Sequence, residues 1–111
     1  EAVRDARENA RINGLRAEFM EADAVAALLG PVRKPDVLVV DPPRAGLSPE
    51  ARSAVIRHRP PDCAIISCHP AALARDVETL VDAGYMLAGL QPFDMFPQTH
   101  HLEAVAFLMR E

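Results

Sequence analysis

Ile65-Ile66-Ser67-Cys68-His69-Pro70 is the stretch that decides the fold, because an apolar run ends in it and a helix signal begins. The residues from Ala64 to Ile66 predict a buried strand. Pro70 suits the first position of a helix, where its missing N–H is not needed. We therefore expect Cys68 at the carboxyl end of a strand and just before a helix, at the edge where open α/β sheets bind ligands.

Cys68 has two interpretations at that place. The dipole of the following helix favours an anion, which makes the thiol a candidate nucleophile. The alternative is a small core residue, since unpaired cysteines are commonly buried. A disulfide with Cys63 is not expected, because five residues of strand separate the two Cα atoms by roughly 16 Å. A reduced, cytoplasmic setting is the corresponding expectation.

Hydrophobic patterns on both sides of this stretch predict the other elements. Helices are expected over residues 1–13, 24–29, 49–59 and 70–83, and strands over 15–20, 37–40, 85–90 and 102–109. The four consecutive apolar residues Val37–Val40 predict a central parallel strand that is buried on both faces. The order of elements predicts an α/β fold with a mostly parallel sheet, helices on both faces and an antiparallel hairpin at the C-terminal end.

The composition excludes several classes of protein. The chain has 111 residues, enough for one domain, and half of them are apolar. A net charge of −4 argues against a broad basic surface for nucleic acid. No apolar run approaches the roughly 20 residues of a membrane span, so no membrane partner is expected. No CxxC or HExxH spacing occurs, so no metal is expected, and no Gly-rich turn links a strand to a helix.

Three segments at strand ends should converge on one edge of this sheet: Asp41 with Arg44, then Cys68, then residues 94–103. A thiol near a carboxylate suits covalent catalysis on an electron-poor ring, where the thiolate adds and a base later removes a proton. An arginine and an aromatic side chain suit the phosphate and the base of a nucleotide.

Most of these residues also have a plainer interpretation. Asp23 precedes a helix, so it is either an N-cap or a ligand contact at a strand end. Asp41 could cap its loop, Arg44 could be solvated, and Glu103 could point outward from an edge strand. A cysteine hydrolase that pairs Cys68 with His101 is a further alternative, although the glycines of a nucleophile elbow do not flank Cys68.

Four segments of the sequence resemble one enzyme family, the bacterial RNA uracil-C5 methyltransferases that make 5-methyluridine in tRNA and 23S rRNA. Residues 93–103, Phe-Asp-Met-Phe-Pro-Gln-Thr-His-His-Leu-Glu, resemble its closing signature. Residues 41–47, Asp-Pro-Pro-Arg-Ala-Gly-Leu, resemble its strand-end motif, and residues 67–76 resemble its nucleophile motif. Residues 9–14, Asn-Ala-Arg-Ile-Asn-Gly, are similar to a family helix.

The resemblance implies a class I, Rossmann-like fold that uses S-adenosyl-L-methionine as cofactor and RNA as partner. It implies that Cys68 attacks C6 of the uracil and that Glu103 is the general base that removes the C5 proton. The cofactor-binding residues that it implies are Asp23, near the adenine, and Asp41, between cofactor and base. The substrate-binding residues that it implies are Arg44, Phe96, Thr99 and His101.

The sequence departs from the family pattern at three positions, where His69 replaces Asn, Ala72 replaces Thr and Ile65 replaces Tyr.

We also expect residues 1–111 to be the C-terminal part of the catalytic domain, with the Gly-rich cofactor loop and the first strands upstream. In the class I strand order 3-2-1-4-5-7-6, residues 15–20 would be strand 3 without its neighbours. That segment should pair with Val37–Val40, pair with another chain, or detach. A piece of this kind is expected to be inactive and to self-associate through the exposed strand Val37–Val40. A self-associating α/β fragment without catalysis is accordingly the main alternative function.

Overall fold

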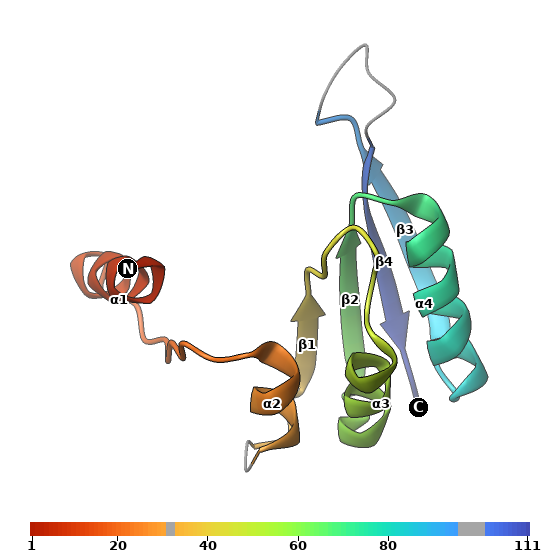
Figure 1. Cartoon of the computed structure of the whole chain (residues 1–111), viewed down its shortest axis with the longest axis horizontal. Coiled ribbons are helices and arrows are strands. Elements are labelled where there is room, and N and C mark those ends of the chain that lie inside the picture. The colour runs from red at the N-terminus through yellow and green to blue at the C-terminus, as the bar shows by residue number, and fades with distance from the viewer. Residues whose placement is uncertain (31–32, 96–101) are drawn as a thin grey trace.

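The computed structural model describes residues 1–30, 33–95 and 102–111. Its elements follow one another as helix, helix, strand, helix, strand, helix, strand, strand (Figure 1). The helices are α1 (Ala2–Ile12), α2 (Ala24–Leu29), α3 (Pro49–His58) and α4 (Pro70–Asp82). The strands are β1 (Val37–Val40), β2 (Asp62–Ser67), β3 (Met86–Phe93) and β4 (Glu103–Met109).

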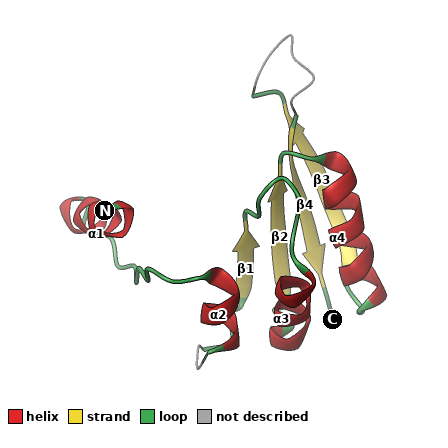
Figure 2. Ribbon diagram, in the orientation of Figure 1, coloured by secondary structure: helices red, strands yellow, loops and turns green. Residues whose placement is uncertain are grey.

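The strands form one sheet in the order β1-β2-β4-β3 (Figure 2). β1 is parallel to β2, whereas β4 is antiparallel to both of its neighbours. Three strands therefore run in one direction and the inserted β4 runs in the other. This arrangement confirms the expected α/β fold with an antiparallel C-terminal hairpin, and its order is the 4-5-7-6 part of the class I sheet.

The core lies between the sheet and the helices α3 and α4, which cover one face (Figure 1). Ile65 of β2, Val55 of α3 and Leu80 of α4 are fully buried there. The buried Tyr85 hydroxyl donates a hydrogen bond of 2.6 Å to the Pro60 carbonyl oxygen, so its polar atom is satisfied. Apolar burial of this kind supplies most of the stabilisation of such a layer.

The helix signals in the sequence are confirmed at both ends of α3. The Ser48 hydroxyl accepts a hydrogen bond of 3.1 Å from the Ala51 N–H, and Pro49 occupies the first turn. At the other end, Arg59 adopts a left-handed conformation with φ of 50° before the two prolines that follow. Local sequence signals were sufficient here because capping involves residues a few positions apart.

The predicted strand at Leu15–Met20 is wrong, because these residues form no strand. Leu15 and Met20 are each 66% exposed. A strand needs a hydrogen-bonded neighbour, and none of the described strands pairs with this segment. Of the three outcomes expected for it, pairing with Val37–Val40 is wrong, and within this single chain the segment is detached from the sheet. α1, which precedes it, contacts none of the described helices or strands (Figure 1).

Two expectations about the sheet need correction. β1 is an edge strand rather than a central one, and Val37 and Val39 are 58% and 59% exposed. The expected helices on both faces are also wrong, because α2, α3 and α4 lie on the same side of the sheet (Figure 1). The cause is the same in both cases, since no described element covers the far face or the open side of β1. The register aligns the exposed apolar side chains of that face: Val37, Val39, Met86, Phe107 and Met109.

Candidate active site

The register of the sheet brings Cys68 and Glu103 to the same place. The ladder between β2 and β4 ends with Ser67 opposite Ala104. Cys68 follows Ser67 and Glu103 precedes Ala104, so both residues lie directly beyond the last pair of this ladder. Because β4 lies between β2 and β3, the interpretation of Glu103 as an edge-strand residue is wrong.

Hydrogen bonds on both sides of Cys68 hold the turn from β2 into α4. The buried Ser67 hydroxyl donates to the His69 carbonyl oxygen and accepts from the His69 N–H, both at 3.0 Å. His69 is the N-cap of α4, and its Nδ1 accepts a hydrogen bond of 3.2 Å from the Ala72 N–H. His69 thus fills the capping role for which asparagine is the more common residue. Cys68 is positioned between two anchored neighbours.

The two cysteines differ in their surroundings, and both are free thiols. Cys63 lies in β2 with only 3% of its surface exposed, and burial raises its pKa to about 11. Cys68 is half-buried at the strand end. The role of a small core residue therefore belongs to Cys63, and Cys68 is the more exposed of the two thiols.

A buried carboxylate attaches the loop after β1 to α4. Asp76 is fully buried and its Oδ2 accepts a hydrogen bond of 2.8 Å from the Leu47 N–H. Its Oδ1 lies 3.3 Å from the guanidinium of Arg52 and 3.6 Å from that of Arg75. Arg75 also donates to the Ala45 carbonyl oxygen. The loop that carries Asp41 and Arg44 is therefore fixed to the helix that begins next to Cys68.

Sequence reasoning missed Asp76, although a signal was present. Asp76 occupies the helical spacing of Leu73, Val77 and Leu80, which form the buried side of α4. A carboxylate on such a face must find partners, because an unpaired buried charge is strongly unfavourable. A lone aspartate in an apolar helical stripe was thus a pointer to a buried ion pair.

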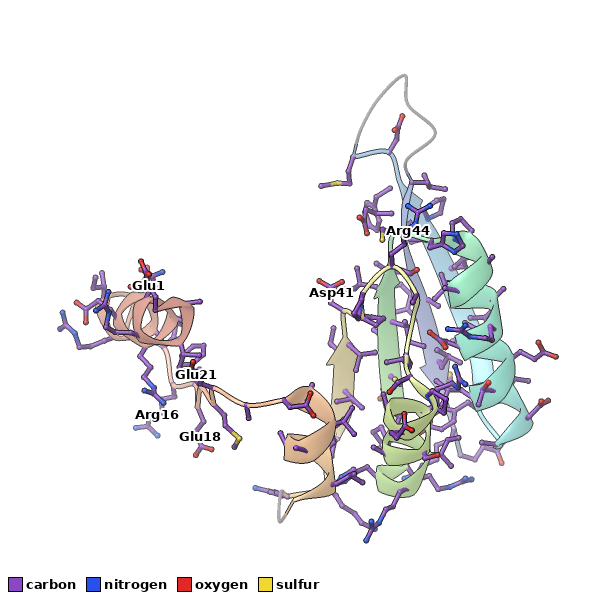
Figure 3. The ribbon with its side chains drawn as sticks, viewed as in Figure 1. Glu1, Arg16, Glu18, Glu21, Asp41 and Arg44 are labelled. Carbon is purple, nitrogen blue, oxygen red and sulfur yellow. The ribbon has the colours of Figure 1, made fainter. Side chains whose placement is uncertain are left out.

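Gly46 lets the loop approach Asp76 closely. Its φ is +83°, and a Cβ at this position would lie 2.6 Å from the Asp76 Oδ2. Its N–H donates a hydrogen bond of 2.8 Å to the Pro43 carbonyl oxygen, which closes a tight turn around Arg44. Figure 3 shows Asp41 and Arg44 in this loop at the upper edge of the sheet. Any other residue at position 46 would be strained and would clash.

Asp23 and Asp41, the two predicted cofactor-binding residues, line one cavity of about 440 Å³. Asp23 also caps α2, because its Oδ2 accepts a hydrogen bond of 2.9 Å from the Ala26 N–H. Both interpretations of Asp23 are therefore compatible. The other walls come from α2, β1, the following loop and α3, and they are mostly apolar: Val25, Leu28, Val39, Val40, Pro42, Pro43, Leu47, Ala51 and Val55. Apolar walls with two carboxylates suit a flat heterocycle that carries hydroxyl or amino groups.

The predicted site residues are brought together only in part. Asp41, Arg44, Cys68 and Glu103 lie at the same end of the sheet, at the ends of β1, β2 and β4. Phe96, Thr99 and His101 lie outside the described residues.

Among the residues that are described, no group of three or more His, Cys, Asp and Glu side chains could hold a metal ion. Within the same ranges, the helices are too short or too polar to cross a bilayer.

Comparison with known sequences shows which family the chain belongs to. A family model described as tRNA (Uracil-5-)-methyltransferase matches residues 4–111. An uncharacterized RNA methyltransferase of Gloeobacter violaceus is 50% identical over 109 residues, which are 98% of this chain and 24% of the relative. Another, of Streptococcus pyogenes serotype M18, is 43% identical over 114 residues, covering 99% of this chain and 25% of the relative. The chain thus spans about a quarter of the length of these curated relatives.

Two solved structures share the fold. The tRNA (uracil-54, C5)-methyltransferase of Pyrococcus abyssi, solved with S-adenosyl-L-homocysteine, has a TM-score of 0.82 at 39% identity. The match covers 97% of this chain and 26% of that one. A precorrin-6y C5,15-methyltransferase of Geobacter metallireducens has a TM-score of 0.70 at 20% identity over 94% of this chain and 60% of that one. The second likeness concerns the fold alone.

Proposed function

Because the chain belongs to the tRNA (uracil-5-)-methyltransferase family, we propose that it carries the nucleophile and the general base of a methyl transfer to C5 of a uridine. The methyl donor is S-adenosyl-L-methionine and the substrate is tRNA or 23S rRNA, modified in the cytoplasm. The observation that best supports the proposal is the register of β2 and β4, which brings Cys68 and Glu103 to adjacent strand ends. The two residues serve opposite halves of one reaction.

In the first half, the Cys68 thiolate adds to C6 of the uracil. A bond forms between Sγ and C6, and the electron pair of the C5–C6 double bond moves onto C5 and the neighbouring carbonyl. C5 thereby becomes a nucleophile. S-adenosyl-L-methionine, when bound, supplies an electrophilic methyl group for it.

In the second half, Glu103 acts as the base. Its carboxylate removes the proton that remains on C5, the C5–C6 double bond forms again, and the Cys68 thiolate leaves C6. The anchored turn around Cys68 supports its role as nucleophile and leaving group, because a displaced thiol could neither add to C6 nor leave it along the same path.

The cavity lined by Asp23 and Asp41 is our proposed cofactor site. The carboxylates can accept hydrogen bonds from ribose hydroxyl or amino groups, with Asp23 toward the adenine and Asp41 toward the reacting base. The related Pyrococcus abyssi enzyme was solved with S-adenosyl-L-homocysteine, which supports the choice of cofactor. We propose that Arg44, Phe96, Thr99 and His101 contact the RNA. The 111 residues on their own are proposed to be inactive, since they contain no Gly-rich turn for the cofactor.

The test of this function replaces the nucleophile in the full-length protein. Cys68→Ser should reduce methyl transfer from labelled S-adenosyl-L-methionine to RNA to background, while RNA binding remains close to that of the unaltered protein. Cys63→Ala is the matched control, because it removes the other thiol, which lies within β2 and outside the site. Turnover by Cys68→Ser at the unaltered rate would rule out the covalent mechanism.

The second variant tests the base. Glu103→Gln should allow addition and methyl transfer but slow proton removal, so a covalent protein–RNA adduct should accumulate on denaturing gels. The double variant with Cys68→Ser should form no adduct. A loss of activity without any adduct would mean that Glu103 has a different role.

A further inference from the structure

A second cavity lies between the loop after β1 and the start of α4. Its volume is about 520 Å³. Arg44 and Ala45 of the loop contribute to it, and α4 and its cap contribute His69, Ala71, Ala72 and Arg75. His69 is the neighbour of Cys68 in sequence, so the cavity adjoins the proposed reaction centre without including the thiol.

The charge of this cavity is positive, although the whole chain carries −4. Its charged lining residues are Arg44 and Arg75, and no carboxylate of the described part of the chain lines it. Asp76, a carboxylate beside the cavity, is buried beneath the loop and contacts Arg52 as well as Arg75. The guanidinium groups of Arg52 and Arg75 therefore share this carboxylate, and Arg44 adds a further positive charge at the wall of the cavity.

Arg75 is more exposed than Arg52, although both contact Asp76. The Arg52 side chain is 18% exposed beside Asp76, whereas the Arg75 side chain is 50% exposed. Arg75 donates to the Ala45 carbonyl oxygen, and this contact holds its guanidinium at the wall of the cavity. A guanidinium carries five N–H donors, so several remain for a ligand.

His69 adds a donor to the same wall. Its Nδ1 accepts the hydrogen bond from the Ala72 N–H, so the neutral ring carries its hydrogen on Nε2. The ionisable side chains of the cavity therefore offer hydrogen-bond donors and positive charge, and none of them offers a negative charge. This chemistry selects an anion, and fork-shaped guanidinium groups match the oxygens of a phosphate.

We propose that the cavity between Arg44 and Arg75 binds a backbone phosphate of the RNA next to the target uridine. This inference rests on the proposed function, which identifies RNA as the substrate. The phosphate contact would fix the position of the RNA strand on the loop and α4, so that the uracil is presented to Cys68. Contacts to phosphate position an RNA without reading its sequence.

The test measures the affinity of the full-length protein for a uridine-containing RNA hairpin across a series of salt concentrations. Arg44→Gln and Arg75→Gln should each weaken binding roughly tenfold at low salt and reduce the slope of log K against log[salt] by about 0.7–0.9, the effect of one phosphate contact. Arg57→Gln is the matched control, because it removes an exposed arginine from the last turn of α3 outside the cavity.

Two further variants separate phosphate binding from loop anchoring, because Arg75→Gln also removes the contact with Ala45. Arg75→Lys keeps the charge and should keep most of the salt slope. Ala71→Glu leaves every arginine in place, adds a carboxylate to the wall of the cavity, and should weaken binding as strongly as Arg75→Gln. Ser53→Glu, on the exposed side of α3, is its control and should change affinity less than twofold.

The outcomes distinguish this inference from the proposed function. Unchanged affinity and slope in Arg44→Gln, Arg75→Gln and Ala71→Glu would overturn the phosphate site, while adduct formation through Cys68 would still support methyl transfer. Failure of the unaltered protein to bind the RNA and to transfer a methyl group to it would overturn the proposed function, and the phosphate site with it.

Discussion

The sheet body and the N-terminal arm of this protein differ in how far their apolar side chains are buried. The sheet body comprises β1–β4 with α2, α3 and α4, and the N-terminal arm comprises residues 1–22 with α1. Ile65 in the sheet body is fully buried, whereas Ile12, Leu15 and Met20 in the arm are 65%, 66% and 66% exposed. Figure 3 shows Arg16, Glu18 and Glu21 on the arm, apart from the sheet. Both regions carry apolar residues, so composition alone does not account for the difference.

The arm contains a helix but no strand, and this contrast shows what each element needs. α1 forms because its hydrogen bonds join residues four apart, and Arg11 pairs with Glu8 at 2.6 Å within it. The strand predicted next to it would need a neighbour in the sheet. Local interactions therefore produce a helix in the arm, whereas residues 15–20 form no strand although their alternating pattern predicts one.

The largest expected effect comes from a matched pair of substitutions in the two regions. Ile65→Ala should lower the free energy of unfolding of the 111-residue chain by about 3–4 kcal/mol, because it leaves a cavity in the packed core. Ile12→Ala should change the same quantity by less than about 0.5 kcal/mol, since the side chain is exposed and alanine favours a helix. Urea unfolding followed by circular dichroism gives both values. Similar losses in the two variants would show that the arm packs on the sheet body in solution.

Alkaline pH should affect the sheet body and leave the arm unchanged. The pKa of Cys63 is raised from 9.0 to about 11 by burial, so the folded state holds its proton longer than the unfolded state does. Stability should be complete below pH 9 and should fall by about 2–3 kcal/mol as the pH rises toward 11. Tyr85, whose pKa burial also raises from 10.0, adds to the loss above pH 10.

The measurement for this prediction is the urea midpoint at pH 8, 9, 10 and 11. Cys63→Val removes the titrating thiol, so most of the fall between pH 9 and 11 should disappear in that variant. An undiminished fall in Cys63→Val would assign the alkaline loss to another group.

The smallest expected effect concerns association between copies of the chain. We propose that the 111-residue chain self-associates through the open side of β1 and the uncovered face of the sheet, because an exposed apolar edge is a template for pairing. Val39→Lys should weaken the association by about 1 kcal/mol, a few-fold in the dissociation constant. Met20→Lys, at an equally exposed position on the arm, should have no effect. Sedimentation velocity at several concentrations measures both, and a monomer at every concentration would contradict the proposal.

Much of the sheet body could be predicted, because its signals are local and agree with one another. The caps Ser48 and Asp23 mark helix starts, and the apolar run before Cys68 marks a strand end. The candidate site was predicted only in part. Cys68 was placed correctly at a strand end, whereas Asp76 was missed because its partners Leu47 and Arg52 lie 29 and 24 positions away.

The sequence by itself determined the helices, the strands of the sheet body and the membership in a family, since each depends on residues that are close in the chain or on motifs read as letters. Only the tertiary structure decided which strands pair. Long-range pairing places Glu103 and Cys68 at adjacent strand ends and leaves β1 at the edge of the sheet. Residues 15–20 form no strand, because none of the described strands pairs with them. Strand hydrogen bonds join distant segments, so a pattern can specify a strand while only the available neighbours decide whether and where it pairs.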